Sequence, residues 1–335
     1  MANFENITLE KGMYGVAGKS FTQVLEELDS SENYRGTPLE GLDAYQRQLK
    51  RFGIKVSGPG SDRVEKFFTS TASAALFPEY VTRAVKQGMD RNNKVSDLVA
   101  TVTKISGSDY RTLAVTDDTD TQTGKISTGP IDQGAALPAT TLYTGSGLVQ
   151  MNKRGRMLVA SYEVLRFQKL DLLTVALKRI GALIAQDQMN DAVSVLTQGM
   201  TYAEATPSYA DFVSLWGALA PYKLNTVIAG TDAMEKILNI SEFKDAAAGN
   251  DFQGSGKVCT PLGANLLHIP GMAAGKIVAF DKDCALEMVQ AGDVTADADK
   301  LIDRQLERAS ISAIAGFARI YADAAKGMAY TVSGD

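Results

Sequence analysis

The chain has 335 residues, of which 45% are hydrophobic and 22% are charged, with a net charge of -5 at neutral pH. This balance is typical of a folded protein and argues against bulk disorder. The scattered Lys and Arg residues argue against the basic face of a nucleic-acid-binding protein, and no apolar run approaches the length of a membrane span. The N-terminus shows no secretory signal, so we expect the protein to stay in the cytoplasm where it is made.

The N-terminal stretch GMYGVAGKS, residues 12–20, ends in Gly-Lys-Ser, as a phosphate-binding loop does. Such a loop needs a glycine where this chain has Met13, and it follows a buried apolar strand that the preceding polar sequence does not provide. We therefore expect a flexible, turn-rich arm and no nucleotide site at Lys19. A helix should begin after Ser20, because Ser20 and Gln23 match a capping box.

The next elements are predicted from apolar spacing and from glycine and proline positions. Residues 39–53 predict a helix that Gly53 closes, and residues 58–60 predict a linker. A short helix should begin near Pro78, since proline is favourable in the first turn. Near-alternation over residues 94–116 predicts strand structure.

Residues 116–141 carry almost no apolar side chains, which is unusual for a stretch of this length inside a compact domain. We interpret the stretch as a projecting hairpin arm whose contacts lie on another molecule. Its acidic run, Asp117, Asp118 and Asp120, lacks the glycine and the glutamate that a calcium loop needs. A solvated loop is therefore expected there, without a metal.

Alternation resumes after the arm, over residues 142–164, and predicts further strand. Residues 171–199 then repeat apolar side chains at helical spacing, which predicts a helix of about 40 Å ending at Gly199. We expect this helix to be a structural element that spans the molecule, because it is two to three times the usual length. The remainder predicts short elements, namely a helix at 210–221, a buried strand at 225–230, a helix at 233–243, a strand within 252–271, a strand pair at 277–281 and 284–291, and a closing strand set at 306–334.

No group of side chains indicates an enzyme. The chain has two cysteines and one histidine, namely Cys259, Cys284 and His268, and none lies in a metal-binding pattern. We expect two buried free thiols and a packed or surface histidine. The carboxylate pairs Glu26 with Glu27 and Asp297 with Asp299 are expected on solvated surfaces, and a second Gly-Lys match at Lys257 is followed by valine. No catalytic, cofactor-binding or metal-binding residue is predicted.

From Phe67 onward, the order of these elements resembles the major capsid proteins of tailed double-stranded-DNA bacteriophages, which have the Hong Kong 97-type fold. The stretches that carry the resemblance are LFPEYVTRAVKQG (76–88), the polar loop region (110–151), MLVASYEVLRFQKLDLLTVALKRIGALIAQDQMNDAVSVLTQG (157–199), the segment from SLWGALAP to LLHIPG (214–271) and the closing LERASISAIAGFARIYADAAKGMAYT (306–331). They look like that family's loop entry, extension loop, spine helix, axial domain and final strands, in this order.

The resemblance implies an α+β fold with an N-terminal arm, an extension loop, a spine helix, a peripheral domain and an axial domain. It implies the following division: an arm with two short helices at 1–66, the entry to the peripheral domain at 67–103, the extension loop, a β-hairpin, at 104–142, the peripheral domain with the spine helix at 143–204, the axial domain at 205–300 and a return to the peripheral domain at 301–335.

The function implied is that of a structural shell protein, which self-assembles as pentamers and hexamers into the icosahedral head enclosing phage DNA. Its partners would be copies of itself, a scaffolding protein, a portal and a possible decoration protein, with DNA only in non-specific proximity and no membrane. It would reside in the virion after assembly in the bacterial host cytoplasm. The glycines Gly145, Gly147 and Gly155 are candidate hinges for expansion of the head.

Two departures from that family's pattern lead to expectations of their own. Some members lose a long, charged, coiled N-terminal region to a protease, whereas residues 1–66 show no coiled-coil pattern here. We therefore expect this region to stay attached in the mature shell and a separate scaffolding protein to guide assembly. Some members also form Lys–Asn crosslinks, but no catalytic Glu or partner Asn can be matched to Lys125, so no crosslink is expected.

Two other readings stay open at the level of sequence. An encapsulin-type bacterial compartment that houses an enzyme would share the fold, although its chain is commonly shorter and its N-terminal segment docks cargo. A soluble nucleotide-dependent enzyme is the third reading, and it rests only on the glycine-rich stretches.

Overall fold

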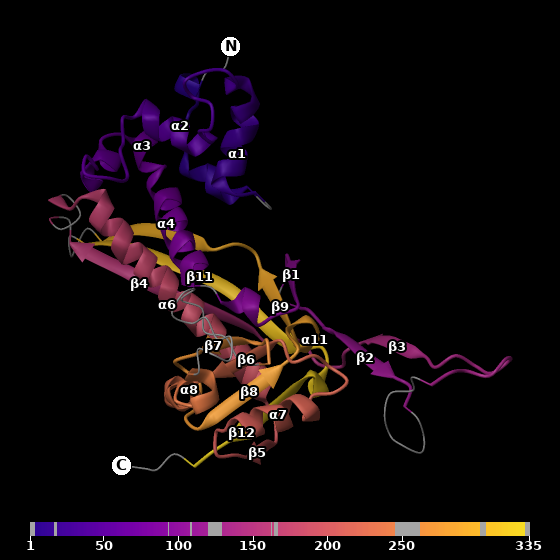
Figure 1. Ribbon diagram of the computed structural model, residues 1–335. Coiled ribbons are helices and arrows are strands. Elements are labelled where there is room, and N and C mark those ends of the chain that lie inside the picture. The colour runs from indigo at the N-terminus through magenta and orange to yellow at the C-terminus, as the bar shows by residue number, and fades with distance from the viewer. Residues whose placement is uncertain are drawn as a thin grey trace. The chain divides into compact units, whose positions relative to one another are not determined.

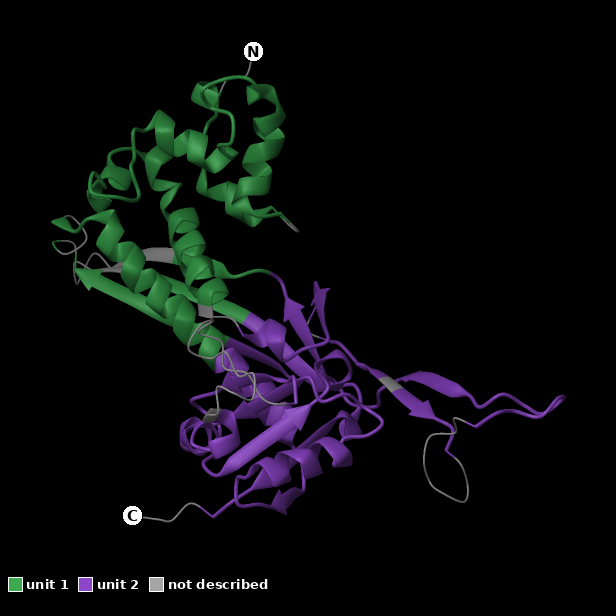
Figure 2. Cartoon of the chain, in the orientation of Figure 1, with its two compact units in different colours: residues 1–93, 154–186, 293–313 green, residues 94–153, 187–292, 314–335 purple. Residues whose placement is uncertain are grey.

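The computed structural model describes residues 4–16, 19–92, 94–107, 109–119, 129–161, 163, 167–244, 262–301 and 306–331. The chain forms two compact units (Figure 2): unit 1 is residues 1–93, 154–186 and 293–313, and unit 2 is residues 94–153, 187–292 and 314–335. The chain passes between them after α4, within β4, within α6, between β9 and β10, and within β11. Each unit is described separately below, with the elements labelled as in Figure 1.

Unit 1 is mainly helical. Its elements are η1 (Phe4–Asn6), η2 (Lys11–Gly15), α1 (Phe21–Leu28), η3 (Ser31–Tyr34), α2 (Ala44–Arg51), η4 (Val64–Phe68), α3 (Thr71–Ala74), α4 (Phe77–Asn92), β10 (Thr295–Leu301) and parts of β4 (Met151–Ser161), α6 (Leu170–Thr197) and β11 (Leu306–Arg319). The strand β10 pairs antiparallel with the first half of β11, with Thr295 opposite Ser312.

The helix predicted over residues 39–53 is present as α2 but begins only at Ala44, and capping boxes mark the starts of both α1 and α2. Ser20 and Gln23 form the expected capping box at the start of α1, and Asp43 with Gln46 forms another at the start of α2. Gly53 has a φ of 62° just after α2, a conformation that glycine adopts without strain. The helix predicted near Pro78 is confirmed as α4, although with 16 residues it is longer than the short helix expected.

The residues before α1 pack against the core of unit 1, contrary to the flexible arm that the sequence suggested. Leu9 is only 3% exposed, and the ring of Tyr14 stacks on Phe21 with 4.3 Å between centroids. The hydroxyl of Tyr14 also donates a hydrogen bond to the carbonyl of Ala75. The prediction was wrong because these apolar side chains occur singly in a polar stretch, so no periodic pattern marks their burial.

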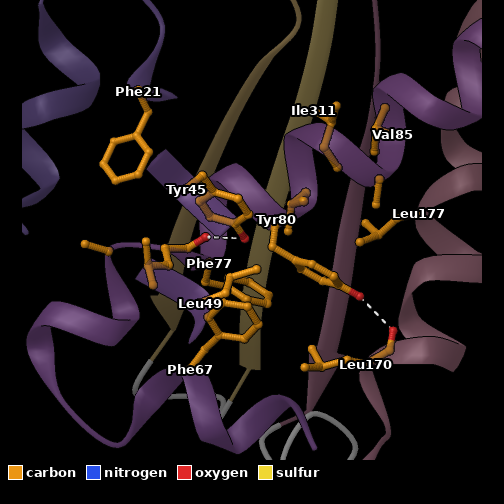
Figure 3. Packing of buried hydrophobic residues seen from close by; sticks show 14 of the residues in the cluster. Phe21, Tyr45, Leu49, Phe67, Phe77, Tyr80, Val85, Leu170, Leu177 and Ile311 are labelled. Atoms are coloured by element: carbon orange, nitrogen blue, oxygen red, sulfur yellow. Dashed lines mark hydrogen bonds between the residues drawn. The ribbon is translucent and has the colours of Figure 1, made fainter. Parts of the chain in front are cut away.

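The core of unit 1 is rich in aromatic side chains (Figure 3). Phe67 lies against Phe77 and Tyr80, with centroid distances of 5.6 and 5.4 Å. The buried Tyr80 hydroxyl donates to the carbonyl of Leu170, at the start of α6. Aromatic pairs at these distances add to the stability that burial itself provides, so they hold the N-terminal region, α4 and α6 in one core.

Unit 2 contains most of the strands. Its elements are η5 (Val95–Asp97), β1 (Thr101–Ile105), β2 (Leu113–Asp117), β3 (Thr140–Thr144), β5 (Tyr202–Glu204), α7 (Tyr209–Ala218), β6 (Thr226–Ala229), α8 (Thr231–Leu238), α9 (Ser241–Lys244), β7 (Asn265–His268), β8 (Lys276–Phe280), α11 (Lys282–Ala285), β9 (Leu286–Ala291), η8 (Ala322–Ala324), β12 (Ala325–Ala329) and the remaining parts of β4, α6 and β11.

One sheet of unit 2 has the order β5-β12-β8-β6-β7. Its strand β6 is buried at every position, as predicted for residues 225–230. In the other sheet, β9 pairs parallel with β1 and antiparallel with the second half of β11. The predicted strand pair at 277–281 and 284–291 is wrong as a pair, because β8 and β9 belong to different sheets. The short helix α11, capped by Asp281, separates the two strands.

The predicted long helix is confirmed as α6, which has 28 residues, and Gly199 follows it with a φ of 69°. The strand structure predicted over residues 94–116 is only partly present, since η5 precedes β1 and irregular chain separates β1 from β2. Among the described helices, none combines the length and the apolar character that a membrane crossing requires.

Candidate assembly site: the hairpin and its stalk

Strands β2 and β3 form a two-stranded antiparallel sheet of their own within unit 2. In their register Val115 lies opposite Leu142, and Leu113 lies opposite Thr144. A hairpin is therefore present at the ends of the polar stretch 116–141, and Figure 2 shows it standing clear of the two larger sheets of the same unit. A hairpin of two strands cannot bury an apolar face by itself.

The hairpin exposes large apolar side chains. Side chains alternate across a strand, so Leu113, Val115 and Leu142 share one face, and Leu113 and Leu142 are 48% and 61% exposed. Tyr143 on the opposite face is 50% exposed, and Leu137 just before β3 is 77% exposed. Several exposed large apolar side chains on one two-stranded hairpin are typical of a surface that contacts another molecule.

The two acidic side chains at the end of β2 serve the hairpin itself. Asp117 accepts a hydrogen bond from the hydroxyl of Thr140, and Asp118 accepts one from the backbone N–H of Ala139 at 2.9 Å. Both carboxylates are thus used in closing the hairpin, which is a role that the sequence did not indicate. Asp120 and Lys125, the other residues considered in this loop, lie outside the described residues.

Residues 110–112 and 145–149 join the hairpin to the sheets of unit 2, and we call these two segments the stalk. The N–H of Val149 donates to the carbonyl of Tyr110 and the N–H of Gly145 donates to the carbonyl of Thr112, each at 2.9 Å. Arg111 adds a side-chain hydrogen bond to the carbonyl of Ser146. The stalk therefore continues the pairing of β2 with β3 toward the sheet.

The stalk meets the buried carboxylate of Glu287 on β9, whose residue is 5% exposed. Tyr110 donates its hydroxyl to Oε1 of Glu287 at 2.8 Å, and Thr112 donates its hydroxyl to Oε2 at 2.8 Å. Thr103 on β1 donates a third hydrogen bond to Oε1. Burial and the hydrogen bond to Glu287 raise the pKa of Tyr110, so its phenol is held in the neutral, donating form.

The three candidate hinge glycines have different surroundings. A Cβ on Gly145 would lie 3.0 Å from the carbonyl oxygen of Thr112, whereas a Cβ on Gly147 would meet nothing within 4 Å. Gly155 lies inside β4, where a Cβ would come within 2.5 Å of the carbonyl oxygen of Ile311. Close approach of two strands thus accounts for glycine at position 155.

The glycine-rich N-terminal stretch forms a short 3-10 helix, η2, and an ion pair. The ammonium of Lys19 lies 2.6 Å from a carboxylate oxygen of Glu27, and both side chains are about half exposed, at 42% and 57%. Residues 17 and 18 are outside the described part of the chain. Gly12 and Gly15 belong to η2, so the backbone there follows a 3-10 turn.

The remaining candidate residues that the structure describes, His268 and Cys284, do not form a common site. His268 ends β7, and its Nε2 lies 2.9 Å from the hydroxyl of Thr231. Cys284 is a half-buried free thiol whose pKa is raised by burial and by the charges of Asp281 and Asp283, whereas Cys259 is outside the described residues. Within the described ranges, no cluster of three or more His, Cys, Asp or Glu side chains could hold a metal ion.

The two predicted carboxylate pairs differ. Burial alone would raise the pKa of Glu26, but hydrogen bonds from Ser31 and from the N–H of Ala44 outweigh this and lower it. Glu26 is therefore a structural acceptor between α1 and α2, contrary to the solvated surface pair expected. Asp297 on β10 is exposed, as predicted.

Sequence reasoning missed two arginine-centred networks in unit 1. The fully buried Arg47 binds Asp29, with 2.9 Å between Nε and Oδ2, and Arg83 binds both Asp43 and Glu79, at 2.7 and 2.8 Å. Arg83 also donates to the hydroxyl of Thr22 on α1. These networks tie α1 and α2 to α4. Only the pair of Glu79 with Arg83 has a helical i, i+4 spacing, whereas the bonds of Arg47 to Asp29 and of Arg83 to Asp43 follow no local spacing rule.

No family model and no curated protein matches the chain. Several solved structures do match its fold. A virus-like particle from Pyrococcus furiosus matches with a TM-score of 0.50 and 14% identity, over 75% of this chain and 99% of that chain. A structure of Mycobacterium phage Che8 matches with a TM-score of 0.50 and 15% identity, over 68% of this chain and 86% of that chain.

A structure of Gordonia phage Cozz matches with a TM-score of 0.51 and 12% identity, over 72% of this chain and 87% of that chain. The long helix α6 and the two-stranded hairpin, described above, are the elements that the resemblance to phage capsid proteins required. The chain therefore has the α+β fold of the major capsid proteins of tailed bacteriophages, the Hong Kong 97-type fold.

Proposed function

We propose that this protein is the structural shell protein of a phage head, and that its copies assemble as pentamers and hexamers into an icosahedral capsid around DNA. The observation that carries the proposal is the apolar hairpin of a chain with a Hong Kong 97-type fold. No catalytic step is assigned to it. A scaffolding protein, a portal and a possible decoration protein would be its partners, and the virion its location.

In this proposal the hairpin of one copy lies over a neighbouring copy. Full burial of a leucine side chain is worth about 1.5–3 kcal/mol relative to exposure. Leu113, Leu137 and Leu142 together would supply a substantial part of one contact between copies. Each copy in a shell makes such contacts with several neighbours, so modest single contacts add up to a stable assembly.

The division of labour along the chain is part of the same proposal. Residues 205–300 would form the axial domain at the centre of each pentamer or hexamer, and 143–204 with 301–335 would form the peripheral domain. Residues 1–66 and 67–103 would be the N-terminal arm and the entry to the peripheral domain, and 104–142 the extension loop. A net charge of -5 suits a wall that must not trap packaged DNA.

The variant Leu142→Asp tests the proposal at the hairpin. Leu142 is 61% exposed in the single chain, so the variant should fold, but a buried charge would prevent the contact between copies. We expect sedimentation velocity and electron microscopy to show folded subunits and few or no shells. Thr141→Asp is the matched control, because it places the same charge on the opposite face of the same exposed strand. Shell formation by Leu142→Asp at the level of the wild type would contradict the proposed contact.

The content of the shells distinguishes a phage head from an enzyme compartment. A phage head produced during infection should protect DNA from added nuclease. Shells that instead contain a co-purifying enzyme and no protected DNA would favour the encapsulin-type reading and contradict the proposed phage role.

A further inference from the structure

We propose that Glu287 is a positioning residue: its buried carboxylate fixes the stalk to β9 and so sets the direction in which the hairpin projects from the sheet that contains β9. The proposal concerns the described contacts of unit 2, and only its consequence for assembly rests on the proposed function. The three hydroxyl donors of Glu287, on Thr103, Tyr110 and Thr112, carry the argument.

The donors come from two different places. Thr103 lies within β1, which pairs with β9 in the sheet, whereas Tyr110 and Thr112 lie in the stalk. Both oxygens of the carboxylate are used, since Oε1 accepts from Thr103 and Tyr110 while Oε2 accepts from Thr112. The Glu287 side chain therefore binds the stalk at two positions, and both lie in the stalk segment that precedes β2.

Glu287 is held in the sheet and cannot move with the stalk. In the sheet, Glu287 lies opposite Thr101 of β1 on one side and opposite Ala318 of β11 on the other. Its neighbours Leu286 and Val289 on β9 are fully buried. Because β9 is paired along both edges, its carboxylate stays in place, and the stalk must leave it if the hairpin changes direction.

Separation of the stalk from Glu287 is unfavourable because the carboxylate is buried and charged. Among the described residues, no ion pair includes Glu287, and the partners they provide for its carboxylate are the three hydroxyl groups. Opening of the stalk would remove two of these three donors and leave a buried carboxylate with one. A buried charge that loses its hydrogen bonds is much less stable than one that keeps them, so the closed stalk is favoured.

Hydrogen–deuterium exchange of the dissociated 335-residue chain measures the opening of the stalk directly. The N–H groups of Gly145 and Val149 are bonded to the stalk carbonyls of Thr112 and Tyr110, so they exchange when the stalk opens. We expect Thr112→Val and Tyr110→Phe each to speed exchange in a peptide covering 144–150 by about tenfold. Exchange in β9 should change little.

Thr103→Val is the matched control, because Thr103 and Thr112 are both half-buried and donate the same kind of bond to the same carboxylate. It removes a donor on β1 and leaves both stalk donors in place, so exchange in peptide 144–150 should stay near the wild-type rate. Equal acceleration by all three variants, or none by Thr112→Val and Tyr110→Phe, would overturn the proposal.

Shell formation is measured separately on the same variants. We expect Tyr110→Phe combined with Thr112→Val to lower the yield of closed shells by about tenfold, while Thr103→Val assembles normally. A normal shell yield from the double variant would overturn the role of Glu287 in assembly. The exchange result would still test whether Glu287 holds the stalk closed. Failure of the wild-type chain to form shells would instead contradict the proposed function and leave the exchange result unaffected.

Discussion

Arg47 is buried completely, yet each part of its guanidinium has a partner. Its Nε binds the Asp29 carboxylate, its Nη2 donates to the carbonyl of Asp29, and its Nη1 donates to the carbonyl of Leu42 and to Ser31. The ring of Tyr34 lies 4.3 Å from the guanidinium carbon. A buried ion pair of this kind is stable only while both charges are present, since removal of either charged side chain leaves the opposite charge buried without compensation.

We predict that Arg47→Met destabilises unit 1 by about 3 kcal/mol, because the variant leaves the carboxylate of Asp29 buried without its cation. Chemical denaturation, followed by circular dichroism, would measure the change in the free energy of unfolding. Arg35→Met is the control, since the side chain of Arg35 is 77% exposed and should cost under about 0.5 kcal/mol. Equal effects of the two substitutions would show that the buried network is not stabilising.

Ionisation of Tyr34 makes the stability of unit 1 depend on pH in the alkaline range. Burial and the hydrogen bond to Asp29 raise the pKa of Tyr34 to about 12, above the value of about 10 expected in the unfolded chain. The neutral phenol therefore stabilises the folded state fully below pH about 10, and this contribution is lost as the pH rises toward about 12. We predict that Tyr34→Phe, measured by denaturation over this range, loses less stability with rising pH than the wild type. Parallel losses in both proteins would contradict this assignment.

At the scale of elements, α4 and α6 pack closely in unit 1 because each contributes a glycine. A Cβ on Gly88 would lie 2.1 Å from the carbonyl oxygen of Lys178, and a Cβ on Gly181 would lie 2.1 Å from that of Val85. Neither distance is sterically possible, and both obstacles are backbone atoms that cannot turn aside. The two helices therefore keep their separation only with glycine at these two positions.

We predict that Gly181→Ala destabilises the chain by at least about 2 kcal/mol, since the helices must separate to admit the methyl group. Gly217→Ala is the matched control. Gly217 also lies in a helix, α7, but a Cβ there meets nothing within 4 Å, so this variant should gain about 0.5–1 kcal/mol from helix propensity. Thermal unfolding of both variants checks the pair, and a stabilised Gly181→Ala would refute the close packing.

Elements with a local signal could be predicted from sequence. The capping box at Ser20, the apolar spacing of α6 and the polar stretch that predicted the hairpin each depend on residues close together in the chain. The partners of β8 and β9 could not be predicted, because two neighbouring strands can enter different sheets without any change in their apolar pattern. The donors of Glu287 were missed for a related reason, as they lie more than 170 positions away in sequence.

At the scale of the whole molecule, the N-terminal region is part of a folded core. Phe21, Tyr45 and Leu49 belong to the same buried cluster as Phe77 and Tyr80 of α4. Removing residues 1–60 would expose that aromatic surface to water and would break the bonds of Arg83 to Asp43 and Thr22. Such exposure is unfavourable, so the packing favours retention of the region in the shell.

We predict that the shell protein in purified particles retains residues 1–66. Intact-mass spectrometry of the dissociated shells would measure the mass of the subunit directly. A subunit that lacks residues 1 to 60 would contradict the prediction and would mean that the aromatic surface of α4 acquires another partner in the shell.

Electron microscopy of the 335-residue chain after expression and purification tests the central claim most directly, because a shell protein must build closed assemblies from copies of itself. We predict hollow particles with icosahedral symmetry, formed by the chain alone or with a scaffolding protein. Monodisperse small particles, with no shells, rings or tubes under any condition, would contradict the assignment of this chain as a shell protein.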